Sequence, residues 1–430
     1  MDRTYIKDLK QHLGKTVKIQ GWVHSIRNQG GIKFILIRDV TGIIQTVVFK
    51  TDEAVFKRAD TLNYETVVSI MGNVKEEKQA PSGFEIQIKE IDVLSQSEPE
   101  LPIPVVPEKG ATNTSQVNRF DMRWLDLRQQ EKLTIFKVWT ALEAGFREYW
   151  HKNHFIQIYT PSFMSSASES GAEVFEVEYF DRKAYLAQSP QFYKQMAMAA
   201  GFERVFMVGP VFRAEPSYTT RHMTEFTGWD FEVSFIESHY DVMNIEEDLL
   251  ISGFLNVNKE LGMSIKVPSK PFPKITLTEA KKQLAKAGVK GEKADNLNAE
   301  EEKYVGKWIE EEKGSEFVWL IDYPISARPF YHMRHEDQPQ LTKSFDLLYK
   351  GIEITTGAQR EHRPEILKAQ ALEAKMDVQQ IQYYIDFFRF GCPPHGGVGI
   401  GPGRIIMMML DLPSVKEATF LPRDVKRLTP

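Results

Sequence analysis

A group of ionisable side chains with the spacing of two paired strands lies between residues 205 and 235 of this 430-residue chain. An apolar run ends at Phe212, and Arg213 and Glu215 follow with the spacing that places two side chains on one face of an extended strand. After a polar loop with Arg221, a second extended run carries further carboxylates. The pattern predicts a long antiparallel hairpin. Burying so many charges is costly unless they are paired or bind a ligand, and a bound triphosphate would offset that cost. The alternative is a surface hairpin whose charged tip is solvated.

A second group with chemical potential lies near the C-terminus, where Gly397, Gly399, Gly401 and Gly403 precede Arg404 at the start of an apolar helix. Glycines allow close backbone approach, and an arginine beside a helix N-terminus can meet a phosphate. The run lacks the Gly-Lys-Ser/Thr of a Walker loop and the βαβ spacing of a dinucleotide site. A tight structural turn explains it equally well.

Three oxygen ligands suited to Mg²⁺ occur close together, namely Asp346, Glu353 and Thr356. Carboxylates with a hydroxyl fit a hard cation that stays partly bound to triphosphate oxygens. We expect Asp346 and Glu353 on one buried apolar strand over residues 344–354, with an exposed edge strand as the alternative. Arg360 follows shortly afterwards and needs an anionic partner.

Composition sets the broad class. A chain of this length predicts two domains, and its apolar and charged fractions are those of an ordinary globular protein. The net charge of −5 gives no global reason to expect nucleic acid, although a local basic groove would suffice. Cys392 is the single cysteine, which excludes an internal disulfide. No long apolar stretch and no signal-peptide pattern occur, so we expect a cytoplasmic protein without a membrane partner.

The elements that must position these groups begin with a β-rich segment over residues 1–101. Five short strands with one helix (residues 52–59) between the third and the fourth indicate an OB-fold barrel. We expect the strands at residues 16–23, 33–38, 43–49, 65–74 and 84–94. Such barrels bind single-stranded nucleic acid by stacking bases on aromatic rings beside basic residues. Phe34 is a candidate, with Lys33, Arg27 and Arg38 nearby in sequence, and a core position is its alternative.

A proline-spaced stretch over residues 101–107 marks a boundary. We expect a linker or hinge over residues 102–128 and a second, α+β domain over residues 129–430, with a lysine-rich peripheral insertion at residues 266–313. Periodicity predicts helices at residues 131–150, 190–200, 237–262, 378–390 and 405–410. Short strands are expected at residues 155–159, 184–188, 318–323 and 344–354.

Taken together, these motifs resemble a class II aminoacyl-tRNA synthetase, specifically an archaeal-type aspartyl-tRNA synthetase. The helix and strand ending at Pro161 resemble the first class motif, residues 212–226 the second, and the glycine run ending in Arg404 the third. The resemblance covers nearly the whole chain. It implies an antiparallel sheet flanked by helices, a homodimer joined through the first motif, and ATP bound in a bent shape.

The resemblance also implies residue roles at the nucleotide. Arg213 and Arg404 would be the catalytic arginines, at the α- and γ-phosphates, with Phe226 stacked on adenine and Mg²⁺ held by Asp346, Glu353 and Thr356. The full set implied to bind ATP comprises Arg213, Ala214, Glu215, Arg221, His222, Met223, Phe226, Glu353, Gly401, Pro402, Gly403 and Arg404.

A second set is implied to bind the amino acid: Glu169, Gln191, Phe192, Tyr193, Lys194, Arg213, Thr356 and Arg360. A substrate carboxylate suits Lys194 and Arg360, because charged pairing in a closed site separates carboxylate from amide strongly. Asparaginyl enzymes, the nearest relatives, lack the lysine in the segment QSPQFYK that ends at Lys194. Two positions depart from the family pattern. Gly403 stands where an acidic residue is usual, and Thr356 replaces a metal-binding serine.

The barrel positions that match anticodon-binding residues are His24, Phe34, Gln45, Pro81 and Glu85. His24 and Pro81 look like the relaxed form of the family, which aspartylates both tRNA-Asp and tRNA-Asn. A tRNA-dependent amidotransferase would then act on the mischarged product. The alternatives are a strict tRNA-Asp enzyme, an asparaginyl enzyme and a non-catalytic tRNA-binding paralogue, which Gly403 alone favours.

Overall fold

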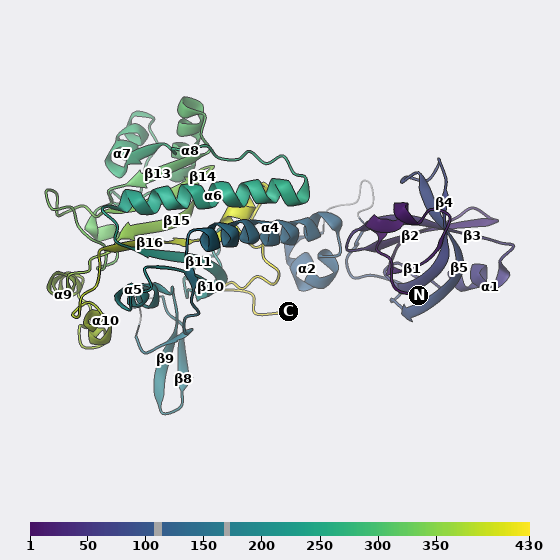
Figure 1. Ribbon diagram of the computed structural model, residues 1–430, viewed down its shortest axis with the longest axis horizontal. Coiled ribbons are helices and arrows are strands. Elements are labelled where there is room, and N and C mark those ends of the chain that lie inside the picture. Colours follow the sequence, from purple (N-terminus) through teal and green to yellow (C-terminus); the bar gives the residue numbers. More distant parts are fainter. Residues whose placement is uncertain (107–113, 167–172) are drawn as a thin grey trace. The chain divides into compact units, whose positions relative to one another are not determined.

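A computed structural model describes residues 1–106, 114–166 and 173–430. It divides into two compact units, residues 1–132 and 133–430 (Figure 1). Glu169, expected at the amino-acid site, lies outside the described residues. Within them, no helix is both long enough and apolar enough to cross a membrane.

The N-terminal unit contains the predicted five-stranded barrel, closed in the order β1-β2-β3-β5-β4. In β1 and β2, buried residues alternate with partly buried ones, so one side of each strand fills the barrel with branched aliphatic side chains. Helix α1 (Glu53–Ala59) lies between the third and fourth strands, as expected. The strands are β1 (Thr16–Asn28), β2 (Ile32–Asp39), β3 (Gly42–Phe49), β4 (Val67–Glu76) and β5 (Phe84–Ser95).

The segment that follows the barrel, with the short helices α2 (Gln116–Asp121) and α3 (Arg123–Asp126), is attached to it by charge. Glu65 is buried and accepts two hydrogen bonds from the guanidinium of Arg38, at 2.9 and 2.7 Å. Arg128 Nη1 donates to the same carboxylate at 3.0 Å. The Glu65 carboxylate therefore joins Arg38 of the barrel to Arg128 of the segment that follows it.

The second unit is built on an eight-stranded sheet in the order β12-β13-β14-β15-β16-β11-β10-β6. Neighbouring strands are antiparallel except at the two edges, where β12/β13 and β10/β6 are parallel. The predicted hairpin is β10 and β11, paired from Arg204↔Val233 to Phe212↔Glu225. The strands are β6 (Ile156–Gln157), β10 (Arg204–Phe212), β11 (Glu225–Ser234), β12 (Lys274–Thr276), β13 (Phe317–Ile321), β14 (Ser344–Tyr349), β15 (Ile352–Gln359) and β16 (His395–Ile400). A small separate sheet has the order β7 (Phe163–Met164), β9 (Arg182–Leu186), β8 (Glu176–Tyr179).

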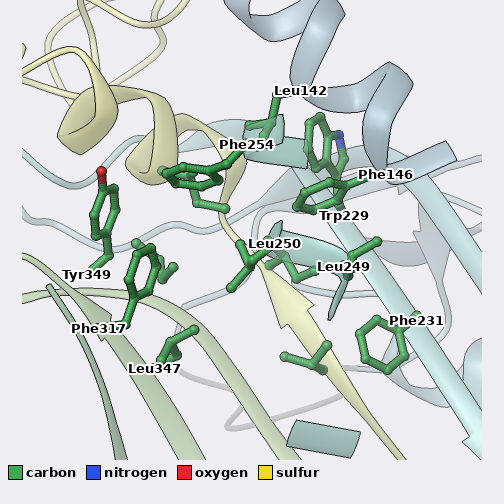
Figure 2. Packing of buried hydrophobic residues seen from close by; sticks show 14 of the residues in the cluster. Leu142, Phe146, Trp229, Phe231, Leu249, Leu250, Phe254, Phe317, Leu347 and Tyr349 are labelled. Atoms are coloured by element: carbon green, nitrogen blue, oxygen red, sulfur yellow. The ribbon is translucent and has the colours of Figure 1, made fainter. Parts of the chain in front are cut away.

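Two long helices, α4 (Gln130–Lys152) and α6 (His239–Leu261), cover one face of this sheet (Figure 1). They pack closely because Gly145 faces Gly253, where an added Cβ would lie 2.8 Å from the opposing Cα. Figure 2 shows the core between helices and sheet, with Phe146 against Trp229 and Phe254 near Phe317. The remaining helices of this unit include α5 (Gln191–Ala199), α9 (Pro364–Glu373), α10 (Gln382–Asp386) and α11 (Pro402–Met409).

The single strand expected over residues 344–354 is wrong. The chain turns at Lys350 and Gly351, both with positive φ, and forms the hairpin β14–β15. Asp346 and Glu353 therefore lie on different strands, and Asp346 is paired across the ladder with Thr356. The apolar run hid the turn because both strands are buried and lack polar alternation.

The lysine-rich segment over residues 266–313 is integrated into the second unit. It supplies β12 at the sheet edge and two capped helices, α7 (Leu277–Lys286) and α8 (Ala299–Lys313). Their apolar faces share a core with Val318, Leu320 and Leu348 of the sheet. The expectation of a peripheral insertion fails for α8, whose Glu302 contacts the candidate site.

Candidate active site

A cavity of about 790 Å³ opens over the central strands of the second unit and collects most of the predicted site residues. Its walls come from α5, β11, β15, β16, α11 and the loop between β10 and β11. The predicted residues that line it are Gln191, Lys194, Arg213, Glu215, Arg221, His222, Met223, Phe226, Glu353, Thr356, Arg360, Gly401, Gly403 and Arg404. Segments as far apart in the sequence as Gln191 and Arg404 thus form one site.

Five predicted residues do not line this cavity. Phe192 is fully buried and stacks on Tyr384 with ring centroids 4.0 Å apart, and Tyr193 packs against the same cluster. Phe192 and Tyr193 therefore belong to the hydrophobic cluster next to the cavity and do not line the cavity itself. Asp346 is treated with the metal ligands below. Ala214 and Pro402 contribute backbone next to lining residues.

One end of the cavity has two buried cations held by two buried carboxylates. Lys194 Nζ donates to Asp230 Oδ2 at 2.7 Å and lies 3.5 Å from Glu232 Oε2. Arg360 Nε donates to Glu232 Oε1 at 3.0 Å, and its Nη2 donates to the Gly397 carbonyl at 2.8 Å. Burial alone would raise the pKa of Glu232, but the charges of Arg360 and Lys194 hold it below the ordinary value. Both side chains are held in fixed orientations, as recognition of a carboxylate requires.

His332 completes this end. It is buried, and burial together with the charges of Arg360 and Arg328 holds the pKa of its imidazole well below the ordinary value. The neutral ring accepts a hydrogen bond from Arg360 Nη1 at 3.1 Å through Nε2. Arg360 is thus fixed from three directions.

The glycine run has two separate uses. Gly397 and Gly399 lie in β16, beside the carboxylates of β11. An added Cβ on Gly397 would lie 2.5 Å from Glu232 Cδ, and one on Gly399 would lie 3.3 Å from Asp230 Oδ2. These two glycines make room for Glu232 and Asp230; Gly397 does not line the cavity, so the sequence expectation of phosphate approach fails for it, whereas Gly399 is a lining residue. Gly401 and Gly403, at the start of α11, remain on the cavity wall.

The other end of the cavity carries three arginines. Arg213 lies with its guanidinium carbon 5.5 Å from the ring centroid of Phe226. Arg404 Nη1 donates to the Glu353 carbonyl at 2.8 Å and to its Oε1 at 3.3 Å. Arg221 Nη1 donates to Glu302 Oε2 at 2.5 Å. A polyanion is the ligand that this group of cations suits.

Position 403 is explained by packing. An added Cβ there would lie 3.1 Å from Val415 Cγ2 and 3.8 Å from Trp139, so a glycine lets the C-terminal segment close over α11. Arg404 takes its orientation from Glu353 instead, and from the Arg221 carbonyl, to which its Nε donates at 3.4 Å. Arg404 is therefore held in position although no acidic residue precedes it.

His222 lies among these cations. Burial, followed by the charges of Arg404, Arg221 and Arg213, lowers the pKa of its imidazole to about 4. The ring is neutral near pH 7, and Thr219 Oγ1 lies 2.6 Å from its Nδ1. A neutral imidazole adds hydrogen-bonding capacity here without adding to the repulsion between cations.

Two of the three expected metal ligands come together on the cavity wall. Thr356 Oγ1 donates to Glu353 Oε1 at 3.4 Å, and both residues lie on β15. Asp346 instead accepts from Arg328 Nη2 at 2.7 Å and does not line the cavity. No group of three acidic, histidine or cysteine residues placed to hold a metal occurs among the described residues. One carboxylate with one hydroxyl fits Mg²⁺ only if phosphate oxygens and water complete its shell.

The loop between β10 and β11 is held by the C-terminal segment, which the sequence did not suggest. Val415 N donates to the Thr220 carbonyl at 2.8 Å, and Thr224 N donates to the Arg423 carbonyl at 3.0 Å. Lys416 Nζ lies 3.8 Å from the ring centroid of Tyr218. The loop that carries Arg221 and His222 is therefore supported along its length.

Sequence reasoning also missed the site roles of Asp230, Glu232, Arg328, His332 and Glu302. The first two could have been found, because carboxylates two apart on a buried strand share a face and need cationic partners. Arg328 and His332 lie outside the strands in a stretch without periodicity, and Glu302 lies in the segment expected to be peripheral. For these three residues no local signal existed.

The predicted anticodon residues lie on the barrel of the first unit. Phe34 is half-buried, outside the barrel core, and Arg27 lies with its guanidinium carbon 5.0 Å from the ring centroid. Gln45 lies on the same face, since it pairs with Leu36, and its Nε2 donates to Glu85 Oε2 at 2.7 Å. The core alternative for Phe34 is therefore wrong.

Two of the basic neighbours expected beside Phe34 are turned away. Lys33 is buried and pairs with Asp60 beneath α1, and Arg38 is buried against Glu65. His24 occupies a bulge between Val23 and Ser25, where Arg38 Nη1 donates to its Nδ1 at 3.2 Å. Pro81 is exposed in the turn between β4 and β5.

Comparison with known proteins agrees with this geometry. The family described as "tRNA synthetases class II (D, K and N)" matches residues 115–425, and "OB-fold nucleic acid binding domain" matches residues 17–94. The chain is 43% identical over 97% of its length to an aspartate–tRNA(Asp/Asn) ligase of Aeropyrum pernix, 96% of which is covered. It is 40% identical over 99% of both chains to an aspartate–tRNA(Asp) ligase of Pyrococcus abyssi. The asparaginyl-tRNA synthetase of Pyrococcus horikoshii, solved with asparaginyl-adenylate, superposes with a TM-score of 0.93 at 31% identity over the full length of both chains.

The barrel, the antiparallel sheet and the arginine-lined cavity define a class II aminoacyl-tRNA synthetase, a class that uses ATP. Within that class, the chain belongs to the archaeal-type aspartyl-tRNA synthetases and is an aspartate–tRNA ligase. The names of its relatives include both tRNA(Asp) and tRNA(Asp/Asn) ligases.

Proposed function

We propose that this ligase charges both tRNA-Asp and tRNA-Asn with aspartate, through an aspartyl-adenylate formed in the cavity of the second unit. The observation that carries the choice of aspartate is the buried pairing of Lys194 with Asp230 and of Arg360 with Glu232. Two cations held in fixed positions favour a ligand carboxylate over an amide, which cannot supply the matching charge.

In the first step, the α-carboxylate of aspartate attacks the α-phosphorus of ATP, a new P–O bond forms, and pyrophosphate leaves. Arg213, which lines the cavity, would contact both the carboxylate and the α-phosphate, and Phe226 would stack on adenine. Arg404 would meet the γ-phosphate. Fixed cations that balance the charge of the leaving pyrophosphate lower the barrier without acid–base chemistry.

Glu353 and Thr356 are the residues that would hold Mg²⁺, which when bound neutralises charge on the phosphate oxygens. In the second step, the 3′-terminal hydroxyl of tRNA attacks the carbonyl carbon of the adenylate, and AMP leaves. The first half-reaction can be tested alone, by pyrophosphate exchange with each amino acid. Exchange that depends on aspartate supports the proposal, and exchange that depends on asparagine refutes it.

Relaxed tRNA choice depends on His24 and Pro81, which have the identities of the relaxed form, and the name of the Aeropyrum pernix relative agrees. Because burial and then Arg38 lower the pKa of His24, its ring meets RNA uncharged at neutral pH. The test is aspartylation of tRNA-Asn and tRNA-Asp transcripts side by side. Comparable efficiencies are expected. A preference for tRNA-Asp of about a thousandfold, equal to about 4 kcal/mol, would show a strict enzyme.

Two partners follow from this proposal. Aspartyl-tRNA-Asn is not a correct product for translation, so a tRNA-dependent amidotransferase would have to convert it. A second copy of the chain is expected at the edge strand β6, where Ile156 is half-exposed and Tyr159 is 82% exposed beside the first class motif. Light scattering of the purified protein at micromolar concentration tests for the dimer.

A further inference from the structure

Glu302 belongs to α8, outside the three motifs that define the class, and yet it contacts the loop of the second motif. Its Oε2 accepts a hydrogen bond from Arg221 Nη1 at 2.5 Å and lies 3.4 Å from the backbone nitrogen of Glu353. The side chains of Glu302 and Arg221 are 7% and 18% exposed. A pair this well shielded from water restricts the guanidinium far more than a surface ion pair would.

The helix that carries Glu302 is fixed to the sheet at short range. Gly306, one turn further along α8, lies against Gly351 in the β14–β15 turn, where an added Cβ would lie 2.5 Å from the Gly351 Cα. A Cβ on Gly351, whose φ is +74°, would in turn lie 2.7 Å from the Cα of Lys303. Residues four apart share one face of a helix, so this contact places Glu302 at a defined height above β15.

The cluster continues through the backbone. Arg404 Nε donates to the Arg221 carbonyl at 3.4 Å, and Arg404 Nη1 donates to Glu353. Two arginines and two carboxylates, on the loop, α11, α8 and β15, therefore form one connected group. Arg221 and Arg404 line the cavity, whereas Glu302 does not. Glu302 thus supports Arg221 from outside the space in which a ligand would lie.

We propose that Glu302 is a positioning residue for ATP. It holds the Arg221 guanidinium in place through one nitrogen, while that group, which has five N–H donors, keeps others to offer to a phosphate. The lysine-rich segment is therefore a structural part of the nucleotide site. The inference rests on the proposed contact of Arg221 with ATP, and it adds the residue that makes this contact pre-organised.

The test compares Glu302→Gln with the matched variant Glu300→Gln, whose side chain is exposed two residues earlier on α8. Pyrophosphate exchange at saturating Mg²⁺ gives KM for ATP and for aspartate separately. Loss of the Glu302 carboxylate that holds Arg221 should raise KM for ATP about tenfold and change KM for aspartate by less than about twofold. Glu300→Gln should change neither. A role limited to folding would not separate the two substrates.

Two further variants keep the outcome unambiguous. Gly306→Ala should move α8 away from the β14–β15 turn without altering a charged residue, and it should also raise KM for ATP. If Glu302 acts through Arg221, the double variant Glu302→Gln/Arg221→Ala should be no worse than Arg221→Ala alone, within about twofold. Additive effects would overturn the inference, as would an unchanged or lower KM for ATP in Glu302→Gln. If Arg221→Ala itself leaves KM for ATP unchanged, the proposed nucleotide role of Arg221 fails instead.

Discussion

At the scale of single residues, the site depends on a few buried charges that are paired with one another. Lys194, Asp230, Glu232 and Arg360 form a connected group, each member with an oppositely charged neighbour. Loss of one member leaves another charge buried and unpaired, which costs more than the contact itself is worth. Selectivity and stability are therefore coupled at this end of the cavity.

Lys194→Met is expected to lower kcat/KM for aspartate in pyrophosphate exchange by about a hundredfold or more, because both the substrate contact and the partner of Asp230 are lost. Lys183→Met, on the exposed strand β9, is the control and should behave like the unaltered protein. A Lys194→Met enzyme within about threefold of the unaltered protein would mean that the lysine does not select the substrate.

His239 predicts a pH effect on stability. Burial, then the charges of His335 and Lys343, lowers the pKa of its ring to about 3, and neither ring nitrogen has a hydrogen-bond partner among the described residues. The unfolded chain therefore takes up a proton near pH 6.5 that the folded protein does not. Stability from this residue is complete above about pH 6.5 and falls as the pH is lowered, by about 2 kcal/mol at pH 5.

His239→Leu should accordingly show a smaller drop in melting temperature between pH 7.5 and pH 5 than the unaltered protein does, measured by differential scanning fluorimetry. His151→Leu, with an exposed side chain, should show the full drop. Equal drops in all three proteins would mean that the His239 ring is charged in the folded state.

At the scale of elements, a strand supplies the space that its neighbour needs. β16 has glycines opposite Asp230 and Glu232 of β11, so the carboxylates occupy the space that side chains of β16 would fill and reach Lys194 and Arg360. The glycine-rich run reads as one motif in the sequence. In the fold, Gly397 and Gly399 leave room for the carboxylates at the amino-acid end of the cavity, whereas Gly401 and Gly403 lie at the start of α11.

Gly397→Ala should therefore damage the amino-acid end first. The added methyl would displace Glu232 and with it Arg360, raising KM for aspartate about tenfold while KM for ATP changes little. The free energy of unfolding should fall by about 1–3 kcal/mol, as for an overpacked core. A matched substitution is Gly209→Ala in β10, where no atom lies within 4 Å of an added Cβ. If Gly397→Ala raises KM for ATP instead, the glycine serves the nucleotide.

At the scale of the whole molecule, two units with separate cores carry the two groups of predicted substrate contacts. The cavity is lined by residues between 136 and 423, all in the second unit, whereas the predicted anticodon residues lie in the first. Arg128 belongs to the first unit and bonds to Glu65 there, in the segment that leads out of the barrel. Damage at this bond should affect tRNA use without affecting adenylate formation.

Arg128→Ala is expected to leave pyrophosphate exchange with aspartate within about twofold, and to lower kcat/KM for tRNA in aminoacylation about tenfold. Arg58→Ala, an exposed arginine on α1, is the comparison for loss of a positive charge from the same unit. Loss of exchange activity in Arg128→Ala would show that the two units are not independent in the first step.

The sequence by itself determined the barrel, the β10–β11 hairpin and the charged motif residues that line the cavity, because strand alternation and the three motifs are local patterns. Only the tertiary structure decided which charges pair. Asp230, Glu232 and Glu302 meet Lys194, Arg360 and Arg221 across separations of 36 to 128 residues, and no periodicity relates them. The same holds for Asp346, which a buried turn moved away from Glu353 and toward Arg328. A buried charge must find an opposite partner, but chemistry alone does not say which one; the packing of strands and of α8 makes that choice.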